Sequence, residues 1–155
     1  MPEKRTPIII GSDHAAYDLK EKVKVFLVER GIDVEDVGSH SEDSVDYPDF
    51  GIKVASMVSG GKFERGILMC GTGIGMSMVA NKFPHVRAAL CSDLFSSIMS
   101  RRHNNSNILV LGGRVVGDIL AMEIVKAWLE TPFEGGRHQR RLEKFDRIDT
   151  AMTVS

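Results

Sequence analysis

Cysteine is scarce in this chain of 155 residues, which holds only Cys70 and Cys91. Both lie inside apolar runs and far apart, so they form neither a disulfide framework nor a closely spaced pair of zinc ligands. The H-E-x-x-H motif of zinc proteases is missing as well. We therefore expect no disulfide, no metal, and a protein suited to a reducing compartment.

Long hydrophobic runs are also lacking. No segment approaches the roughly 20 apolar residues that cross a membrane, and the amino-terminal stretch "MPEKRTPIII" has too short an apolar run for a signal peptide. The formal net charge is only −1, so no overall electrostatic field favours nucleic acid or an anionic membrane. These absences predict a soluble cytoplasmic protein without a nucleic-acid or membrane partner.

Short apolar segments alternate with segments of helical periodicity along the whole chain. The predicted strands are residues 7–11, 32–38, 65–70, 86–91 and 107–113. Apolar residues three and four positions apart predict helices, with the sets Leu19, Val23, Phe26 and Leu27; Phe50, Val54, Met57 and Val58; and Leu120, Ile124, Ala127 and Trp128. This order predicts the α/β class: one domain over residues 1–155, with a five-stranded parallel sheet between helices in a three-layer α/β/α, Rossmann-like fold.

Single residues mark several helix ends. Gly31 is expected to end the first helix, and Pro48 to begin the next one. Asp93 can cap a helix that runs to about His103. The charged segment 137–149 predicts a last, basic helix.

Ligands of parallel sheets bind beyond the carboxyl ends of the strands. That rule selects the loops at residues 11–14, 70–75, 91–93 and 112–114. The loop "CGTGIG" lacks the G-x-G-x-x-G spacing of dinucleotide-binding loops and follows the third strand rather than the first. A nicotinamide cofactor is therefore not expected.

The glycines of this loop expose backbone N–H groups at a helix amino terminus, which favours a bound anion. The same field favours the thiolate form of a neighbouring cysteine. Cys70 with Gly71, Thr72 and Gly73 can thus combine a base or nucleophile with an oxyanion hole. The alternative is a small buried cysteine at a strand end, which is the interpretation of Cys91.

Two further polar groups have both a structural and a functional interpretation. Asp13 can cap the following helix, but capping does not account for His14 beside it. His103 can cap the carboxyl end of a helix, although His103 followed by Asn104 and Asn105 is a dense polar cluster for a turn. Both groups are candidates for a site.

Arginines complete the set of candidate residues. Arg114 follows the fifth strand at the ligand edge, and Arg137 and Arg141 are four residues apart, so they share a helix face that suits a phosphate group. The alternative is a solvated basic surface, which is the interpretation of Arg140. With Cys70, these residues predict cofactor-free chemistry on a small phosphorylated anion, by proton transfer or by hydrolysis.

The segments "SDHAAYDLK", "VDYPDF", "CGTGIGMSMVANK", "RRHNNSNILVLGGRVVG" and "TPFEGGRHQRR" occur in this order between residues 8 and 145. Together they resemble the ribose-5-phosphate isomerase B family, within the wider group that includes galactose-6-phosphate isomerase subunits. The resemblance implies interconversion of ribose 5-phosphate and ribulose 5-phosphate in the pentose phosphate pathway, through a cis-enediolate and without a cofactor. Met76 stands where another branch of the family has a glutamate, so the chain is similar to the branch that uses cysteine.

The resemblance also implies roles for single residues. Cys70 would move a proton between C1 and C2, the loop amides would hold the enediolate oxygen, and His103 would open the furanose ring. The implied catalytic residues are Cys70, His103, Thr72 and Asp13. The implied substrate contacts are Asp13, His14, Tyr47, Gly71, Thr72, Gly73, Ile74, Gly75, Asn104, Arg114, Arg137 and Arg141, with Arg137, Arg141 and His14 on the phosphate.

Members of this family are homodimers, sometimes paired into tetramers, with each site built from two subunits. The last helix would then extend to a partner subunit. The retained cysteine, histidine and arginine-bearing tail favour the pentose enzyme. The alternatives are an isomerase of a hexose 6-phosphate of the allose or galactose type, a non-catalytic sugar-phosphate sensor, and a thiol hydrolase with Cys70 as nucleophile.

Overall fold

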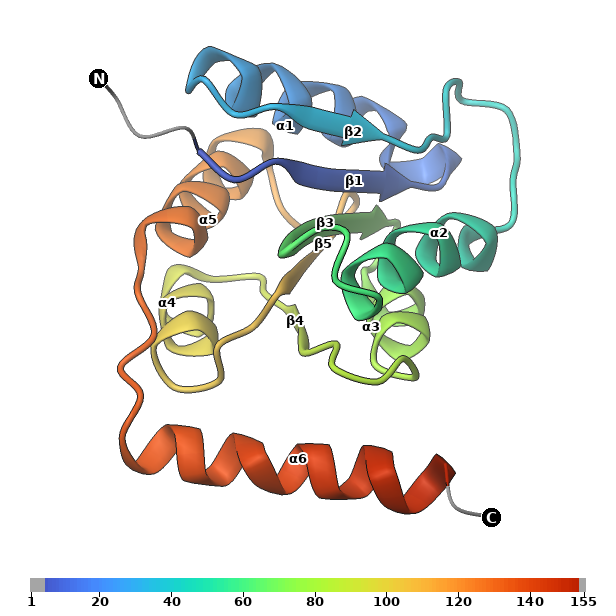
Figure 1. Ribbon diagram of the computed structural model, residues 1–155. Coiled ribbons are helices and arrows are strands. Elements are labelled where there is room, and N and C mark those ends of the chain that lie inside the picture. Colours follow the sequence, from blue (N-terminus) through green and yellow to red (C-terminus); the bar gives the residue numbers. More distant parts are fainter. Residues whose placement is uncertain (1–4, 154–155) are drawn as a thin grey trace.

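A five-stranded sheet forms the centre of the molecule in the computed structural model, which describes residues 5–153 (Figure 1). Its strands are β1 (Ile8–Ser12), β2 (Val34–Asp36), β3 (Arg65–Cys70), β4 (Ala88–Leu90) and β5 (Ile108–Gly112). They lie in the order β2-β1-β3-β5-β4, and all neighbouring strands are parallel. The predicted sheet is confirmed. Residues 1–4 and 154–155, which the predicted domain includes, lie outside the described residues.

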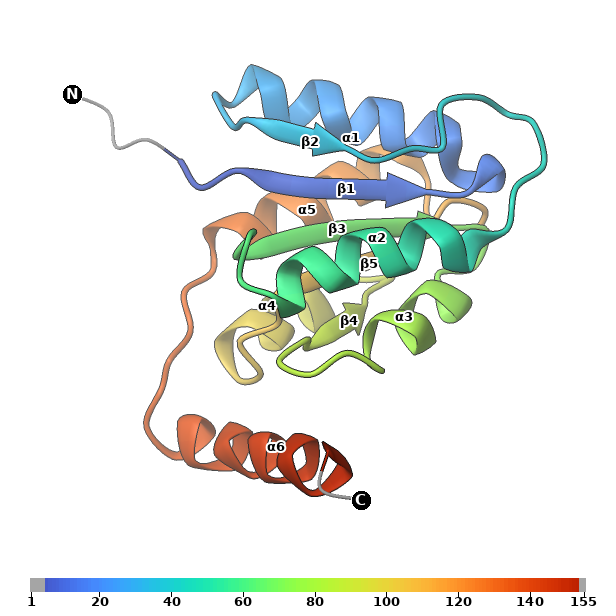
Figure 2. The same cartoon turned by 45° about the vertical axis from the view of Figure 1, so that its right-hand side comes forward.

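Helices cover both faces of the sheet. They are the short 3-10 helix η1 (His14–Ala16), α1 (Tyr17–Glu29), α2 (Tyr47–Ser59), α3 (Ile74–Ala80), α4 (Leu94–Arg102), α5 (Asp118–Glu130) and α6 (Arg137–Thr153). α1 and α5 pack on one face, with α4 beside α5, and α2 and α3 pack on the other (Figures 1 and 2). The three-layer α/β/α fold is therefore confirmed. Among the described residues, no helix is long and apolar enough to span a membrane.

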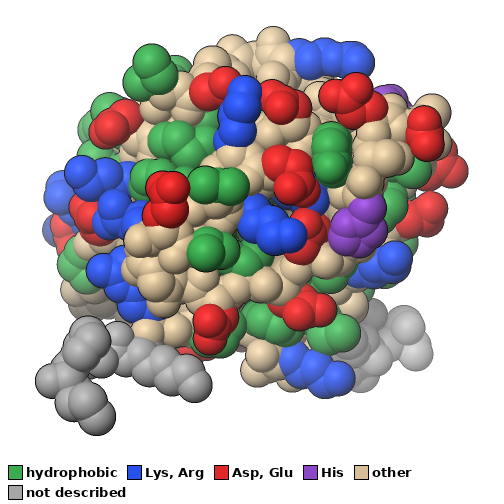
Figure 3. All heavy atoms as spheres, turned by 90° about the horizontal axis from the view of Figure 1, so that it is seen from above, with side chains coloured by type: hydrophobic (Ala, Val, Ile, Leu, Met, Phe, Trp, Pro, Cys, Tyr) green, Lys and Arg blue, Asp and Glu red, His purple; other side chains and the backbone are tan. Residues whose placement is uncertain are grey.

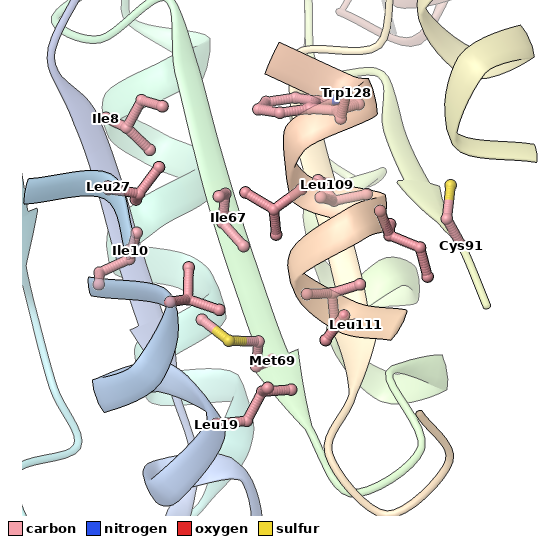
Figure 4. Packing of buried hydrophobic residues seen from close by; sticks show 14 of the residues in the cluster. Ile8, Ile10, Leu19, Leu27, Ile67, Met69, Cys91, Leu109, Leu111 and Trp128 are labelled. Carbon is pink, nitrogen blue, oxygen red and sulfur yellow. The ribbon is translucent and has the colours of Figure 1, made fainter. Parts of the chain in front are cut away.

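Alternate side chains of the central strands enter two separate hydrophobic cores. Ile10, Met69 and Leu111 face α1 and α5, where they meet Leu27 and Trp128 (Figure 4). The opposite core, under α2 and α3, contains Ile9, Leu68, Cys70 and Val110. Because successive side chains of a strand point to opposite faces, Met69 and Cys70 separate, and β3 delivers Cys70 to the side of α2 and α3.

Three predicted helix ends are confirmed. Gly31 follows α1 with a φ of 75°, a left-handed conformation that costs glycine little. Pro48 lies in the first turn of α2, where its missing N–H has no partner to lose. The side chain of Asp93 accepts the N–H of Ser96 at 2.7 Å and caps α4.

Two predicted helix faces were wrong in part. Met57 is 37% exposed and Leu120 is 39% exposed, whereas Ala55 and Ala121 are fully buried. Small side chains let a helix lie close to the sheet, so the close approach, rather than the apolar spacing alone, decides which face is buried. The edge strands β2 and β4 are shorter than predicted, and α6 runs past residue 149.

The surface above α1 and β2 mixes both signs of charge. Figure 3 shows acidic and basic side chains interspersed there with small hydrophobic patches. This face has no field of a single sign, in agreement with the formal net charge of −1.

A buried ion pair ties α1 to the end of β2. Lys20 is fully buried, and its Nζ lies 2.6 Å from Oδ2 of Asp36, whose Oδ1 accepts the N–H of Gly38 at 2.9 Å. Burial by itself would raise the pKa of Asp36, but the hydrogen bonds from Lys20 and Gly38 outweigh it and hold that pKa below its usual value. The stabilisation from this carboxylate is present above the unfolded-state pKa and is lost as the pH falls from there through the lowered native value.

Replacing Lys20 by Met should lower the free energy of unfolding by about 3 kcal/mol at neutral pH, because the buried Asp36 carboxylate loses its closest cation. The loss should shrink as acid protonates Asp36, and urea denaturation at neutral and acidic pH measures both effects. Lys22→Met is the matched control, since it removes only exposed ion pairs with Asp18 and Asp118 and should change stability little. Equal losses in the two variants would contradict this role of the pair.

Candidate active site

Three loops meet at the carboxyl edge of the sheet. Cys70 ends β3 and is paired with Gly112, the last residue of β5. The backbone N–H of Gly113 donates to the Cys70 carbonyl at 2.8 Å, and the N–H of Asp13 donates to the Met69 carbonyl at 3.2 Å. The loops after β1, β3 and β5 are therefore joined by main-chain hydrogen bonds at the edge where the sequence predicts a ligand.

The thiol of Cys70 receives a hydrogen bond from its own loop. The N–H of Gly73 donates to Sγ of Cys70 at 3.2 Å, and Cys70 is buried where β3 enters the glycine loop. Gly73 has a φ of 81°, and a Cβ there would overlap the side chain of Leu90 and lie 3.2 Å from the Leu111 carbonyl carbon. Only glycine fits this position, so the turn that aims an N–H at the sulfur depends on it.

Cys91 contrasts with Cys70. It is 1% exposed in the core under α1 and α5, and burial raises the pKa of its thiol to about 11. The neutral thiol therefore predominates at neutral pH. These features support the structural role that was predicted for Cys91.

Asp13 and His14 both hold the loop after β1 in place. Oδ1 of Asp13 accepts the N–H of Ala16 at 3.1 Å, so the predicted capping role is present. Nδ1 of His14 accepts the backbone N–H of Val45 at 3.1 Å. The proton of the neutral imidazole is then on Nε2, which remains a donor for a ligand.

Tyr47 and Arg114 lie against residues 70–75, the cysteine loop. A Cβ on Gly75 would be only 2.5 to 2.8 Å from ring carbons and the hydroxyl oxygen of Tyr47, so the two residues are in direct contact. The Arg114 side chain passes within 3.6 Å of the position that a Cβ would take on Gly71, and the backbone N–H of Arg114 donates to the Gly71 carbonyl at 2.9 Å. Both side chains therefore line the same edge as Cys70.

His103 and Asn104 lie at the other end of the sheet within this chain. His103 caps the carboxyl end of α4, and the chain then enters β5 at Ile108, which pairs with Gly66 at the start of β3. Cys70 is four residues further along β3, or about 13 Å at 3.3 Å per residue. The sequence-predicted residues therefore form two separate groups within the single chain.

Two residues without a predicted role join His103. Its ring stacks on that of His138, with centroids 4.2 Å apart and an interplanar angle of 12°. Oε2 of Glu134 lies 3.5 Å from Nε2 of His138 and 4.0 Å from Nε2 of His103. Burial, followed by the charges of His103 and Arg137, lowers the pKa of His138. The spacing of Glu134 and His138, four residues apart beside the two arginines, was the available sequence signal.

Two arginines of the last helix, α6, lie near the group formed by His103, Glu134 and His138. Arg137 begins α6, and Arg137 and Arg141 are exposed one helical turn apart. α6 lies along the outer side of β4 (Figures 1 and 2), where Leu142 is buried and the N–H of His85 donates to Asp149 at 3.1 Å. A cavity of about 560 Å³ separates part of α6 from the sheet.

The sequence matches the family described as Ribose/Galactose Isomerase over residues 8–145. Ribose-5-phosphate isomerase B of Escherichia coli is 48% identical over 142 residues, which cover 92% of this chain and 95% of that protein. D-erythrulose-4-phosphate isomerase of Pectobacterium atrosepticum is 44% identical over 138 residues, which cover 88% of this chain and 91% of that protein.

Solved structures share the fold. Ribose-5-phosphate isomerase B of Clostridium thermocellum has a TM-score of 0.92 and 51% identity, covering 94% of this chain and 99% of that chain. The enzyme of the same name from Mycoplasma genitalium, with bound ribulose-5-phosphate, has a TM-score of 0.90 and 40% identity, covering 93% and 96%. The similarity thus extends over almost the whole length of each chain.

Iodoacetamide should modify Cys70 at least about tenfold faster than Cys91 near pH 8, because only the thiolate reacts and a thiol of pKa about 11 is then about 0.1% ionised. Peptide mass spectrometry over time gives both rates. In Cys70→Ser the slow rate of Cys91 should persist unchanged. Equal rates for the two cysteines in the native chain would contradict the difference between their environments.

Proposed function

Because the chain belongs to the ribose/galactose isomerase family, we propose that it interconverts ribose 5-phosphate and ribulose 5-phosphate through a cis-enediolate. The chain is a sugar-phosphate isomerase of the aldose–ketose type. The observation that carries the mechanism is the hydrogen bond from the Gly73 N–H to Sγ of Cys70 at the ligand edge. The ribulose-5-phosphate bound in the similar Mycoplasma genitalium structure supports the choice of substrate.

In this proposal Cys70 is the base. Its thiolate takes the proton from C2 of the open-chain aldose, the C2–H electron pair forms the C1–C2 double bond, and O1 becomes negative. Return of the proton to C1, with transfer of the O2 proton to O1, forms the ketose. The N–H of Gly73 supports this role because a hydrogen bond to sulfur is stronger when the sulfur is charged.

The loop amides stabilise the enediolate oxygen. The N–H of Gly73 is already donated to Cys70, and that of Ile74 is donated to Oγ1 of Thr72 at 3.2 Å. We therefore assign the oxygen to the N–H groups of Gly71, Thr72 and Gly75, a smaller set than the whole loop that the sequence predicted. Donors fixed in a turn need no reorganisation when the charge develops.

The residues at the other end of the sheet act on the ring and the phosphate. His103 opens the furanose by proton transfer, next to Asp13 and Thr72 of a second copy of the chain, and Asn104 contacts the sugar. Arg137 and Arg141 bind the phosphate. His14 adds a donor, since Val45 occupies its Nδ1 and leaves the proton on Nε2. Tyr47 and Arg114 line the sugar beside the cysteine loop.

A second copy of the chain completes each site. Cys70 lies at the carboxyl ends of the strands and His103 at their amino-terminal ends, so a substrate in one chain cannot contact both. A symmetric dimer in which the His103 and α6 region of one subunit meets the Cys70 loop of the other brings all the assigned residues together. The exposed arginines at the start of α6 support this arrangement.

A sugar phosphate with a different number of carbons is the main alternative substrate. The similar Pectobacterium atrosepticum protein is named for a four-carbon sugar phosphate, and hexose 6-phosphates such as allose and galactose 6-phosphate differ from ribose 5-phosphate by one carbon. A non-catalytic sensor of sugar phosphates is a further alternative. It needs the arginines but has no use for a thiol that accepts a hydrogen bond from its loop.

A panel of ribose, allose, galactose and erythrulose phosphates, with products identified by NMR, tests the proposal. Ribose 5-phosphate should have the highest kcat/KM, and Cys70→Ala should lower kcat at least about 10³-fold while ribose 5-phosphate still binds by calorimetry. Cys91→Ala is the matched control and should retain turnover. A higher kcat/KM for another sugar phosphate would make that compound the substrate instead. A near-normal kcat in Cys70→Ala would refute the role of Cys70 as the base.

Mixing two inactive variants tests the shared site. Cys70→Ala and His103→Asn, when co-expressed, should regain about a quarter of the wild-type activity, because half of the dimers are mixed and each mixed dimer has one intact site. The activity of the purified mixed dimer measures this directly. If each site were contained in one chain, the mixed dimer would have no intact site and would be as inactive as the parents.

A further inference from the structure

Two imidazoles and one carboxylate converge at the amino-terminal end of α6. Nitrogen atoms of His103 and His138 and an oxygen of Glu134 all lie within 4.8 Å of one another. These residues come from the end of α4, the connection before α6 and the first turn of α6. Glu134 and His138 are four residues apart, but His103 is distant from both in the chain, so the complete set of three was not visible in the sequence.

We propose that His103, Glu134 and His138 bind a divalent transition-metal ion such as Zn²⁺. Two imidazole nitrogens and a carboxylate oxygen form a donor set that zinc and its neighbours prefer, whereas calcium and magnesium take oxygen ligands. Three protein ligands leave one tetrahedral position for water, unlike the four protein ligands of a structural zinc site.

The distances are close to those of a tetrahedral site. Ligand atoms about 2.0 to 2.1 Å from zinc lie roughly 3.3 Å apart, and Nε2 of His138 is already 3.5 Å from Oε2 of Glu134. The 4.0 Å from His103 must shorten by less than 1 Å. The stacked rings must also become inclined so that both nitrogens face the ion. His103 is 39% exposed at a helix end and has room to turn, while the nearly buried His138 stays fixed.

Neighbouring residues hold the carboxylate in place. Nε of Arg102 lies 3.4 Å from Oε1 of Glu134, which leaves Oε2 toward the imidazoles. The backbone N–H of Glu134 also donates to the Arg102 carbonyl at 3.0 Å, fixing the connection before α6. Such outer contacts orient metal ligands. The positive charges of Arg102, Arg137 and Arg141 oppose a cation, so binding is expected to be reversible rather than very tight.

Metal binding has a consequence for catalysis that rests on the proposed function. An ion bound through Nε2 of His103 occupies one ring nitrogen and fixes the imidazole beside Glu134, so the ring is no longer free to transfer the proton in ring opening. Zinc should therefore inhibit the isomerase, and chelation should restore it. Binding itself requires no assumption about the substrate.

A second cluster of similar composition provides a control. His85, Asp146 and Asp149 also lie within 4.8 Å of one another, but this cluster has one imidazole, and His85 is exposed. Cys70 is the other group that attracts zinc, through its thiolate. His85→Gln and Cys70→Ser therefore separate the proposed site from its two competitors.

Calorimetric titration of the metal-free protein with Zn²⁺, and with Co²⁺ followed by its visible absorption, tests the proposal. The wild type should bind one ion per chain through this site, and Glu134→Gln and His138→Gln should each weaken binding at least about tenfold. His85→Gln and Cys70→Ser should retain it. Circular dichroism melting confirms that each variant is folded, and Glu134, which is half exposed, is the safer position to change.

Absence of zinc binding, equal binding by wild type and Glu134→Gln, or its loss in Cys70→Ser or His85→Gln would each overturn the site. Inhibition is measured separately, as the zinc concentration that halves each protein's own metal-free rate. Glu134→Gln should need at least about ten times more zinc than the wild type. Binding without inhibition would leave the site standing and would refute ring opening by His103.

Discussion

The parallel alignment of β1, β3 and β5 determines where the polar loops of the candidate site lie. It brings the loops after the three strands to one edge, where the N–H of Gly113 and the N–H of Asp13 join them through main-chain hydrogen bonds. Cys70 is the last residue of the central strand β3, so its backbone is fixed from both sides. The only freedom left is in the turn that follows, and there Gly73 directs its N–H to the sulfur.

The same alignment separates the two groups of polar residues. Each helix must run back against the strands before the next strand begins, so the end of α4 lies at the opposite edge from the end of β3 (Figure 1). His103 cannot approach Cys70 within one chain. In the proposed mechanism, the base Cys70 and the acid His103 would therefore come from two chains. The basic helix α6 lies outside the sheet, on the side of β4 (Figures 1 and 2).

Residues with local causes were predicted well. The segment "RGILMC" is β3 without a shift, because a continuous apolar run fits a strand buried on both faces. Asp93, Pro48 and Gly31 act within one turn of chain, and all three were identified. Met57 and Leu120 were misplaced because their exposure depends on how close each helix lies to the sheet. The full burial of Lys20 was also invisible, since its partner Asp36 belongs to another element.

The amino-acid sequence was enough to predict the order of strands and helices, the glycine turn after Cys70 and the membership of an isomerase family. Each of these depends on residues that are neighbours in the chain or on motifs that occur in a set order. The three-dimensional fold was needed to show that Cys70 and His103 are apart, and that Glu134 and His138 lie beside His103. Those relations join residues distant in sequence. They arise from the direction in which helices pack back on a parallel sheet, which no local pattern records.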